Sequence, residues 1–257
     1  MPGIGILSPS PHSRFFSGII DMAAAPELIE EAGQQAGGAI RYNIYRVIHK
    51  ALRAFMTDTL QKVGRADIDD DCERTQALES VRALLATCLG HLRHENEFVH
   101  PALERARSGA AQQTADDHED HVTAIEKLQA KLVQVQQSQG SQRAELWHEL
   151  YLALSHFVAE NFEHMIVEET HNHAILVSAY SDAEILGIQQ AIVASLTPEE
   201  SMTDMRWMLP FISARERAFL LSGMKTNVPQ EVFGAVLALA RDVLSQRDFY
   251  KLERTLG

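Results

Sequence analysis

Cysteine, tryptophan and positive charge are scarce in this chain. Its 257 residues include 2 Cys and 2 Trp, and its 23 Lys and Arg are outnumbered by 35 Asp and Glu, for a formal net charge of −12. Cys72 and Cys88 form neither a disulfide framework nor a C-x-x-C pair, and we expect both to be small core residues of a helix. An acidic surface repels phosphate backbones, so we expect no nucleic-acid partner.

Long hydrophobic runs are also missing. A representative apolar stretch, residues 232–240, is far shorter than the ~20 residues that a membrane helix needs. The first residues, MPGIGILSPSPHSRFF, lack the basic segment and long apolar segment of a secretory signal. We therefore expect a cytoplasmic protein that has no membrane contact.

Apolar residues recur at helical spacing along the middle of the chain, and no segment keeps the period of two that marks a strand. Residues 1–37, rich in Gly, Pro, Ser and Ala, are expected to form an extended arm with one short helix near 26–32. Four long amphipathic segments follow, at 40–64, at 72–107, from a Thr114 cap to a break at 138–141, and at 145–179. Long helices joined by short loops predict an all-α, up-down four-helix bundle over residues 38–180.

Residues 181–257 have a different pattern, with shorter helical segments, clear start signals and no histidine. Three segments open with the spacing of a capping box, in which a side chain at the cap and a Glu three residues later satisfy backbone N–H groups. These pairs are Ser181 with Glu184, Thr197 with Glu200, and Ser213 with Glu216. We predict a C-terminal helical extension that covers the bundle or joins copies of the chain into an oligomer.

Histidine is the abundant residue with chemistry to offer: there are 12, and all except His12 lie within the predicted bundle. The second and fourth helices each contain a His-x-x-x-Glu unit, whose two side chains lie on one helix face about 6 Å apart. One such pair is common on solvated helices. Here two pairs occur, and each of the other two helices has a histidine, so all four helices can direct a metal-binding side chain into the bundle. The candidate metal ligands are His49, His91, Glu95, His118, His164 and Glu168.

These six side chains suit a pair of metal ions. Four imidazoles and two bridging carboxylates leave positions open on two six-coordinate ions, and the carboxylates offset the charge of the ions. Nitrogen and oxygen ligands without thiolate favour iron or manganese, and zinc would also bind.

Several further residues have two interpretations. His121 is either the rival of His118 or an extra ligand. His156 and Glu160 form a third pair, which adds a ligand, lines a path to the metals, or is a polar pair on the bundle flank. Glu169 either accepts a hydrogen bond from a ligand imidazole or lies on the surface, and Tyr45 either faces the site or packs in the core. We expect His94, Glu97 and His100 to face solvent, because they lie on other faces of the second helix.

The ordered set resembles the hemerythrin-like (HHE cation-binding) family over about residues 38–180. The family pattern is a lone His, a His-x-x-x-Glu ahead of a Pro, a second lone His and a second His-x-x-x-Glu. In this sequence it falls on His49, on His91 and Glu95 ahead of Pro101, on His118, and on His164 and Glu168. The resemblance implies two iron ions in a non-haem centre of the Fe–O–Fe type that binds or reacts with dioxygen.

The sequence departs from classical oxygen-carrying hemerythrins at two points. The His pair of their third helix is absent, since position 122 is Val, and a carboxylate replaces one His of the fourth helix. Fewer nitrogen ligands favour oxygen activation, so we predict a dioxygen-dependent oxidase or oxygenase of a small molecule, with an electron donor that the sequence does not identify. The alternatives are a protein that binds or senses oxygen, nitric oxide or iron without turnover, and a helical scaffold whose histidines bind nothing.

Overall fold

The computed structural model describes residues 41–257, which form helices joined by short loops and contain no strand. The predicted all-α class is therefore confirmed. The predicted arm at 1–37, with its short helix near 26–32, lies outside the described residues. The described chain divides into two compact units, one of them Asn43–Tyr180 and the other Ser181–Gly257 together with residues 41–42.

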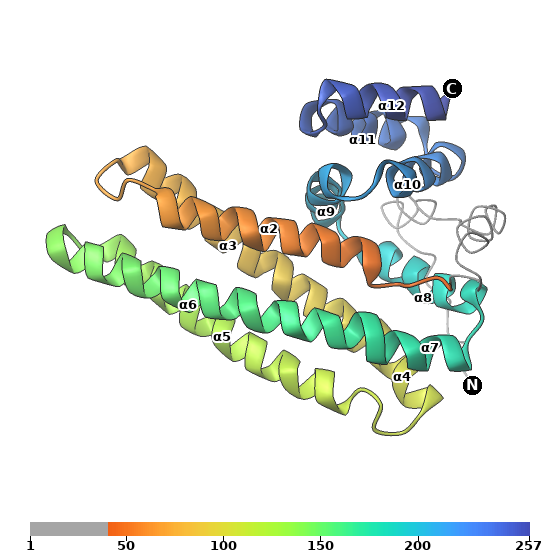
Figure 1. Cartoon of the computed structure of the whole chain (residues 1–257), viewed down its shortest axis with the longest axis horizontal. Helices are drawn as coiled ribbons and strands as arrows, with labels where there is room; N and C mark the ends of the chain where they lie inside the picture. The colour runs from red at the N-terminus through yellow and green to blue at the C-terminus, as the bar shows by residue number, and fades with distance from the viewer. Residues whose placement is uncertain (1–40) are drawn as a thin grey trace, which may run out of the picture. The chain divides into compact units, whose positions relative to one another are not determined.

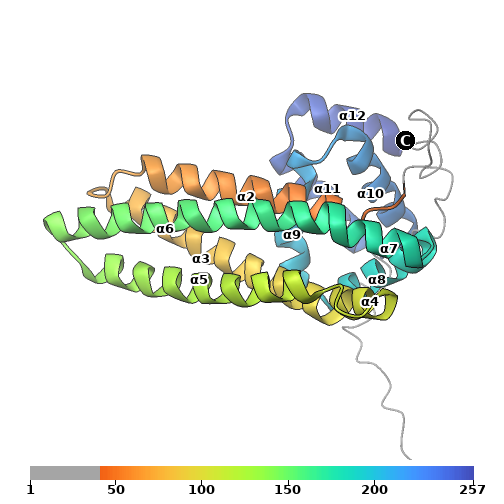
Figure 2. The ribbon, with the colours of Figure 1, turned by 60° about the horizontal axis from the view of Figure 1, so that its bottom comes forward.

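The first unit is built on four long helices, α2 (Arg46–Arg65), α3 (Asp71–His94), α5 (Gln112–Gln137) and α6 (Gly140–Val167). Each helix packs against the next along the chain, and α6 returns to α2, so the four close into an up-down bundle (Figures 1 and 2). Leucine and other apolar side chains fill its interior, as their helical spacing predicts. Cys88 belongs to this core, whereas Cys72 is exposed at the start of α3, contrary to prediction.

Two of the long helices continue through a π-helical turn. The turn η4 (Glu95–Val99) leads from α3 into α4 (His100–Ala106), and η5 (Glu168–Asn172) leads from α6 into α7 (His173–Ala179). Each π turn rotates the residues that follow it about the helix axis.

This rotation explains one wrong prediction. His100 is buried at 7% exposure rather than solvated, and its ring stacks on that of His118 with centroids 4.8 Å apart. His94 is buried as well, whereas Glu97 is exposed as expected. The expected Thr114 cap is also wrong: α5 begins at Gln112, and the Glu104 carboxylate accepts hydrogen bonds from the backbone N–H groups of Gly109 and Ala111 just before it.

The second unit contains five shorter helices, α8 (Asp182–Ser195), α9 (Pro198–Phe211), α10 (Ala214–Asn227), α11 (Gln230–Val243) and α12 (Gln246–Leu256). All three predicted capping boxes are present, at the starts of α8, α9 and α10. Leu209, Leu221, Met224 and Ala240 lie at the centre of an apolar core that belongs to this unit. Over the whole described range, no helix combines the length and the apolar character needed to cross a bilayer.

Candidate metal centre

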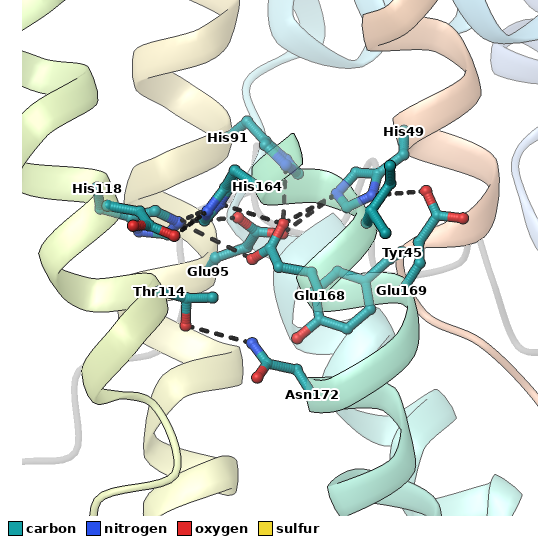
Figure 3. Close-up of polar contacts among 12 residues, drawn as sticks. Tyr45, His49, His91, Glu95, Thr114, His118, His164, Glu168, Glu169 and Asn172 are labelled. Carbon is teal, nitrogen blue, oxygen red and sulfur yellow. Dashed lines mark hydrogen bonds and ion pairs between the residues drawn. The ribbon is translucent and has the colours of Figure 1, made fainter. Parts of the chain in front are cut away.

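All four long helices of the bundle contribute side chains to one buried cluster. His49 comes from α2, His91 from α3, His118 from α5 and His164 from α6, and each π turn begins with a glutamate, Glu95 in η4 and Glu168 in η5. Figure 3 shows the imidazoles arranged around the two carboxylates. Five of the six side chains are buried and His91 is nearly so. The sequence thus identified six residues that the fold does bring together.

The two glutamates lie at the centre of this cluster. Glu95 and Glu168 belong both to a group with His49 and His91 and to a group with His118 and His164, and within each group the potential ligand atoms lie within 4.8 Å of one another. The Oε1 atom of Glu95 is 3.2 Å from His91 Nε2, and its Oε2 atom is 3.5 Å from His118 Nε2. Because each carboxylate is shared by both groups, it can bridge two cations.

The cluster leaves buried polar atoms without hydrogen bonds. Both carboxylate oxygens of Glu95 and of Glu168 have no hydrogen-bond partner, and neither have the Nε2 atoms of His49 and His91. Their nearest charged neighbours are one another, at 3.2 Å from Glu95 Oε1 to His91 Nε2, and burying such groups without hydrogen bonds is costly. A pair of cations would satisfy these atoms together, and a donor set of imidazole nitrogens and carboxylate oxygens suits iron, manganese or zinc. The residues present therefore fit a two-metal site.

The outward nitrogens of three imidazoles are held by acceptors. His49 Nδ1 lies 3.0 Å from Glu169 Oε1, which also accepts a hydrogen bond from Arg53. An acceptor at Nδ1 keeps the proton there and leaves Nε2 free to bind a metal. Glu169 therefore has the acceptor position that the sequence left open.

Two further acceptors were not found from the sequence. Asn96 Oδ1 lies 2.7 Å from His118 Nδ1, and Asp117 Oδ2 lies 3.1 Å from His164 Nδ1. Both residues stand directly beside a candidate ligand in the sequence, but no spacing rule distinguishes them from other polar neighbours. They bond to imidazoles of other helices, so only the packing of the bundle identifies them.

Without a cation, protons hold part of this cluster together. Burial lowers the pKa of His164, but Glu168 and the other nearby carboxylates together outweigh burial and raise this pKa to about 9. Burial also lowers the pKa of His49, and Glu169 and Glu95 raise it to about 9. Burial and the charge of Glu168 raise the pKa of Glu95 to about 7. Cations would replace these protons, because a metal binds the neutral imidazole.

The remaining candidates lie outside the cluster or at its edge. His121 is buried with its ring centroid 4.9 Å from that of His164, but it belongs to neither group of potential ligands, whereas His118 does. His156 Nε2 and Glu160 Oε1 are 3.2 Å apart, with side chains 76% and 46% exposed. That pair is a polar contact on the bundle flank. Tyr45 is buried, with its ring centroid 5.3 Å from that of His49.

Comparison with known proteins gave one family match. The family described as the hemerythrin HHE cation binding domain matches residues 41–184, which is more than half of the chain. Neither the curated proteins nor the solved structures contained a match. The matched range includes all six cluster residues, from His49 to Glu168.

Proposed function

The chain belongs to the hemerythrin HHE cation-binding domain family, and on this premise we propose that its cluster holds two iron ions and activates dioxygen for the oxidation of a small molecule. The His and Glu cluster makes it a metal-binding, hemerythrin-like protein. Iron, as the metal, and oxidase or oxygenase activity are our proposals, and manganese and zinc are compatible with the same ligands.

The observation that carries the proposal is the sharing of Glu95 and Glu168 between the two ligand groups. Bound iron would supply one-electron and dioxygen chemistry. The shared carboxylates offset the charge of two cations in a buried site, and they change their mode of binding more easily than imidazoles do. Glu169 and Asp117 orient the imidazoles of His49 and His164 from outside. A site rich in carboxylates favours turnover over reversible carriage.

A second candidate function is supported by the helices of 181–257. They have a core of their own, which includes Leu209 and Leu221, so they are suited to act as an output or association module. In that case the bundle would bind oxygen, nitric oxide or iron and release it unchanged. The two functions differ in whether the ligand is consumed.

Metal analysis tests the premise that both candidate functions share, which is that the cluster binds metal. The protein would be made in iron-replete cells without chelators, and its metal content measured by plasma mass spectrometry. We expect about two irons per chain, because the cluster contains two groups of potential ligands. The double variant His91→Ala, His164→Ala should lose the iron, and the exposed control His156→Ala should keep it. Wild-type protein that keeps its helicity but takes up no metal on reconstitution would overturn the proposal.

Exposure of the reduced protein to air separates the two functions. The enzyme should consume dioxygen together with an added reductant or small-molecule substrate. A carrier or sensor should form a stable adduct whose spectrum returns to the starting one under vacuum. Full recovery of the spectrum, without consumption of either reactant, would rule out the oxidase.

A further inference from the structure

One polar group beside the cluster is left without a partner. Tyr45 lies directly before α2, one turn ahead of His49, and its side chain is 2% exposed. Its hydroxyl group is buried and makes no hydrogen bond to any residue of the described range 41–257. In Figure 3 the phenol ring extends past Glu168 toward Asn172. A buried hydroxyl without an acceptor is unfavourable, so such a group indicates a missing partner.

The phenol lies within the electrostatic reach of both shared carboxylates. Burial, followed by the negative charges of Glu168 and Glu95, raises the pKa of Tyr45 well above its usual range, whereas Asn172 acts to lower it. A phenol keeps its proton near neutral pH, so the hydroxyl is a hydrogen-bond donor. Its ring is tilted at 34° to the His49 imidazole, with the ring centroids 5.3 Å apart.

The other polar groups on this side of the cluster satisfy one another. Asn172 Nδ2 donates to Thr114 Oγ1 over 3.2 Å. Thr114 Oγ1 in turn lies 3.2 Å from the carbonyl oxygen of Ala111, to which it donates, and 3.3 Å from His100 Nε2. All of these side chains are buried. Within residues 41–257 the Tyr45 hydroxyl forms no hydrogen bond, although Asn172 lies beside it, so a bound species is left to supply the acceptor.

We propose that the Tyr45 hydroxyl donates a hydrogen bond to a small anion bound at the metal pair, while Asn172, held by Thr114, keeps the phenol in place. This inference rests on the proposed function, because the anion needs the cations. Two divalent ions bring four positive charges and Glu95 and Glu168 remove two, which leaves a positive, buried centre that attracts an anion. An anion of two or three heavy atoms is the class of ligand that such a hydrogen bond would select.

Azide binding to the iron-loaded protein tests the proposal. Azide would be titrated into wild-type protein and into Tyr45→Phe, and its dissociation constant read from the absorption band that azide forms with ferric iron. We expect Tyr45→Phe to bind azide about ten-fold more weakly, equivalent to about 1.4 kcal/mol. The control Tyr151→Phe loses the hydroxyl of a ring that lies against Gly64, away from the cluster, and should bind azide like wild type.

Iron content distinguishes the failure of this inference from that of the proposed function. Equal azide affinity in wild type and Tyr45→Phe, at equal iron content, would overturn the hydrogen bond alone. A wild-type protein without iron would overturn the proposed function and the inference with it. A phenolate-to-iron absorption band in anion-free wild type, absent from Tyr45→Phe, would show that the phenol binds the metal and would also overturn the inference.

A stability measurement adds a readout that is independent of iron. In metal-free protein the hydroxyl makes no hydrogen bond, so Tyr45→Phe should leave the melting temperature unchanged or raise it slightly. A fall of about 3 °C or more would show that the hydroxyl is bonded within the chain, contrary to the proposal.

Discussion

The Nε2 atoms of His118 and His164 lie 3.1 Å apart in the interior of the bundle. Two neutral imidazoles whose Nδ1 protons point to Asn96 and Asp117 would place two lone pairs against each other at this distance. One proton must therefore lie between the rings in the metal-free protein. His164 carries that proton, because its pKa is raised. A cation would take the place of that proton.

The third-helix ligand can be decided by two matched variants. His118 belongs to a ligand group and His121 does not, although both are buried on α5. We expect His118→Ala to lose at least one of about two bound metal ions and His121→Ala to keep both. Metal content per chain, by plasma mass spectrometry, is the measurement. If His118→Ala kept its metal and His121→Ala lost it, His121 rather than His118 would be the ligand from α5.

The carboxylate of Asp117 should strengthen metal binding through His164. Replacing Asp117 by Asn keeps an oxygen near His164 Nδ1 but removes its charge, so we expect metal affinity to fall about 10- to 100-fold. Competition with a chelator of known affinity measures the change. The control Asp116→Asn alters an exposed residue that bonds only Gln112 in this region, and it should bind metal like wild type. Equal losses in the two variants would indicate a general effect of charge.

The metal-free protein should lose stability as the pH rises from about 7 to 9. His49 and His164 have pKa values of about 9 when folded, against 6.5 for unfolded histidine. The stability that they contribute is complete below the lower value and is lost as the pH rises through the higher one, because the folded protein then gives up protons. Thermal unfolding in a chelator, followed by circular dichroism, measures this. A melting temperature that rises over the range would contradict the shifted pKa values.

Arg217 should stabilise the second unit. Its buried guanidinium donates to the carbonyl oxygens of Leu209 (2.6 Å) and Ile212 (3.1 Å), which closes the end of α9. Arg217→Met would leave both oxygens without these donors, at a cost of about 2–4 kcal/mol in the free energy of unfolding. Urea denaturation would measure it. The exposed neighbour gives the control, and Arg215→Met should change the free energy by less than about 0.5 kcal/mol.

Local patterns in the sequence were sufficient for much of the architecture. The capping boxes at Ser181, Thr197 and Ser213 depend on residues three apart, and they formed as predicted. The pairs His91 with Glu95 and His164 with Glu168 likewise depend on one helical turn each. Interactions within a turn are set by residues close in the chain, so a sequence contains them directly.

The sequence by itself determined an all-α chain, the order of its ligand-type residues and the helix that carries each. Only the tertiary structure decided that His118 rather than His121 enters the cluster and that Asn96 and Asp117 hold imidazoles of other helices. It also decided that the Tyr45 hydroxyl makes no hydrogen bond within the part of the chain that the structure describes. The physical reason is rotation about the helix axis. The face that a residue presents depends on packing against several helices and on the π turns at Glu95 and Glu168, which no local spacing rule specifies.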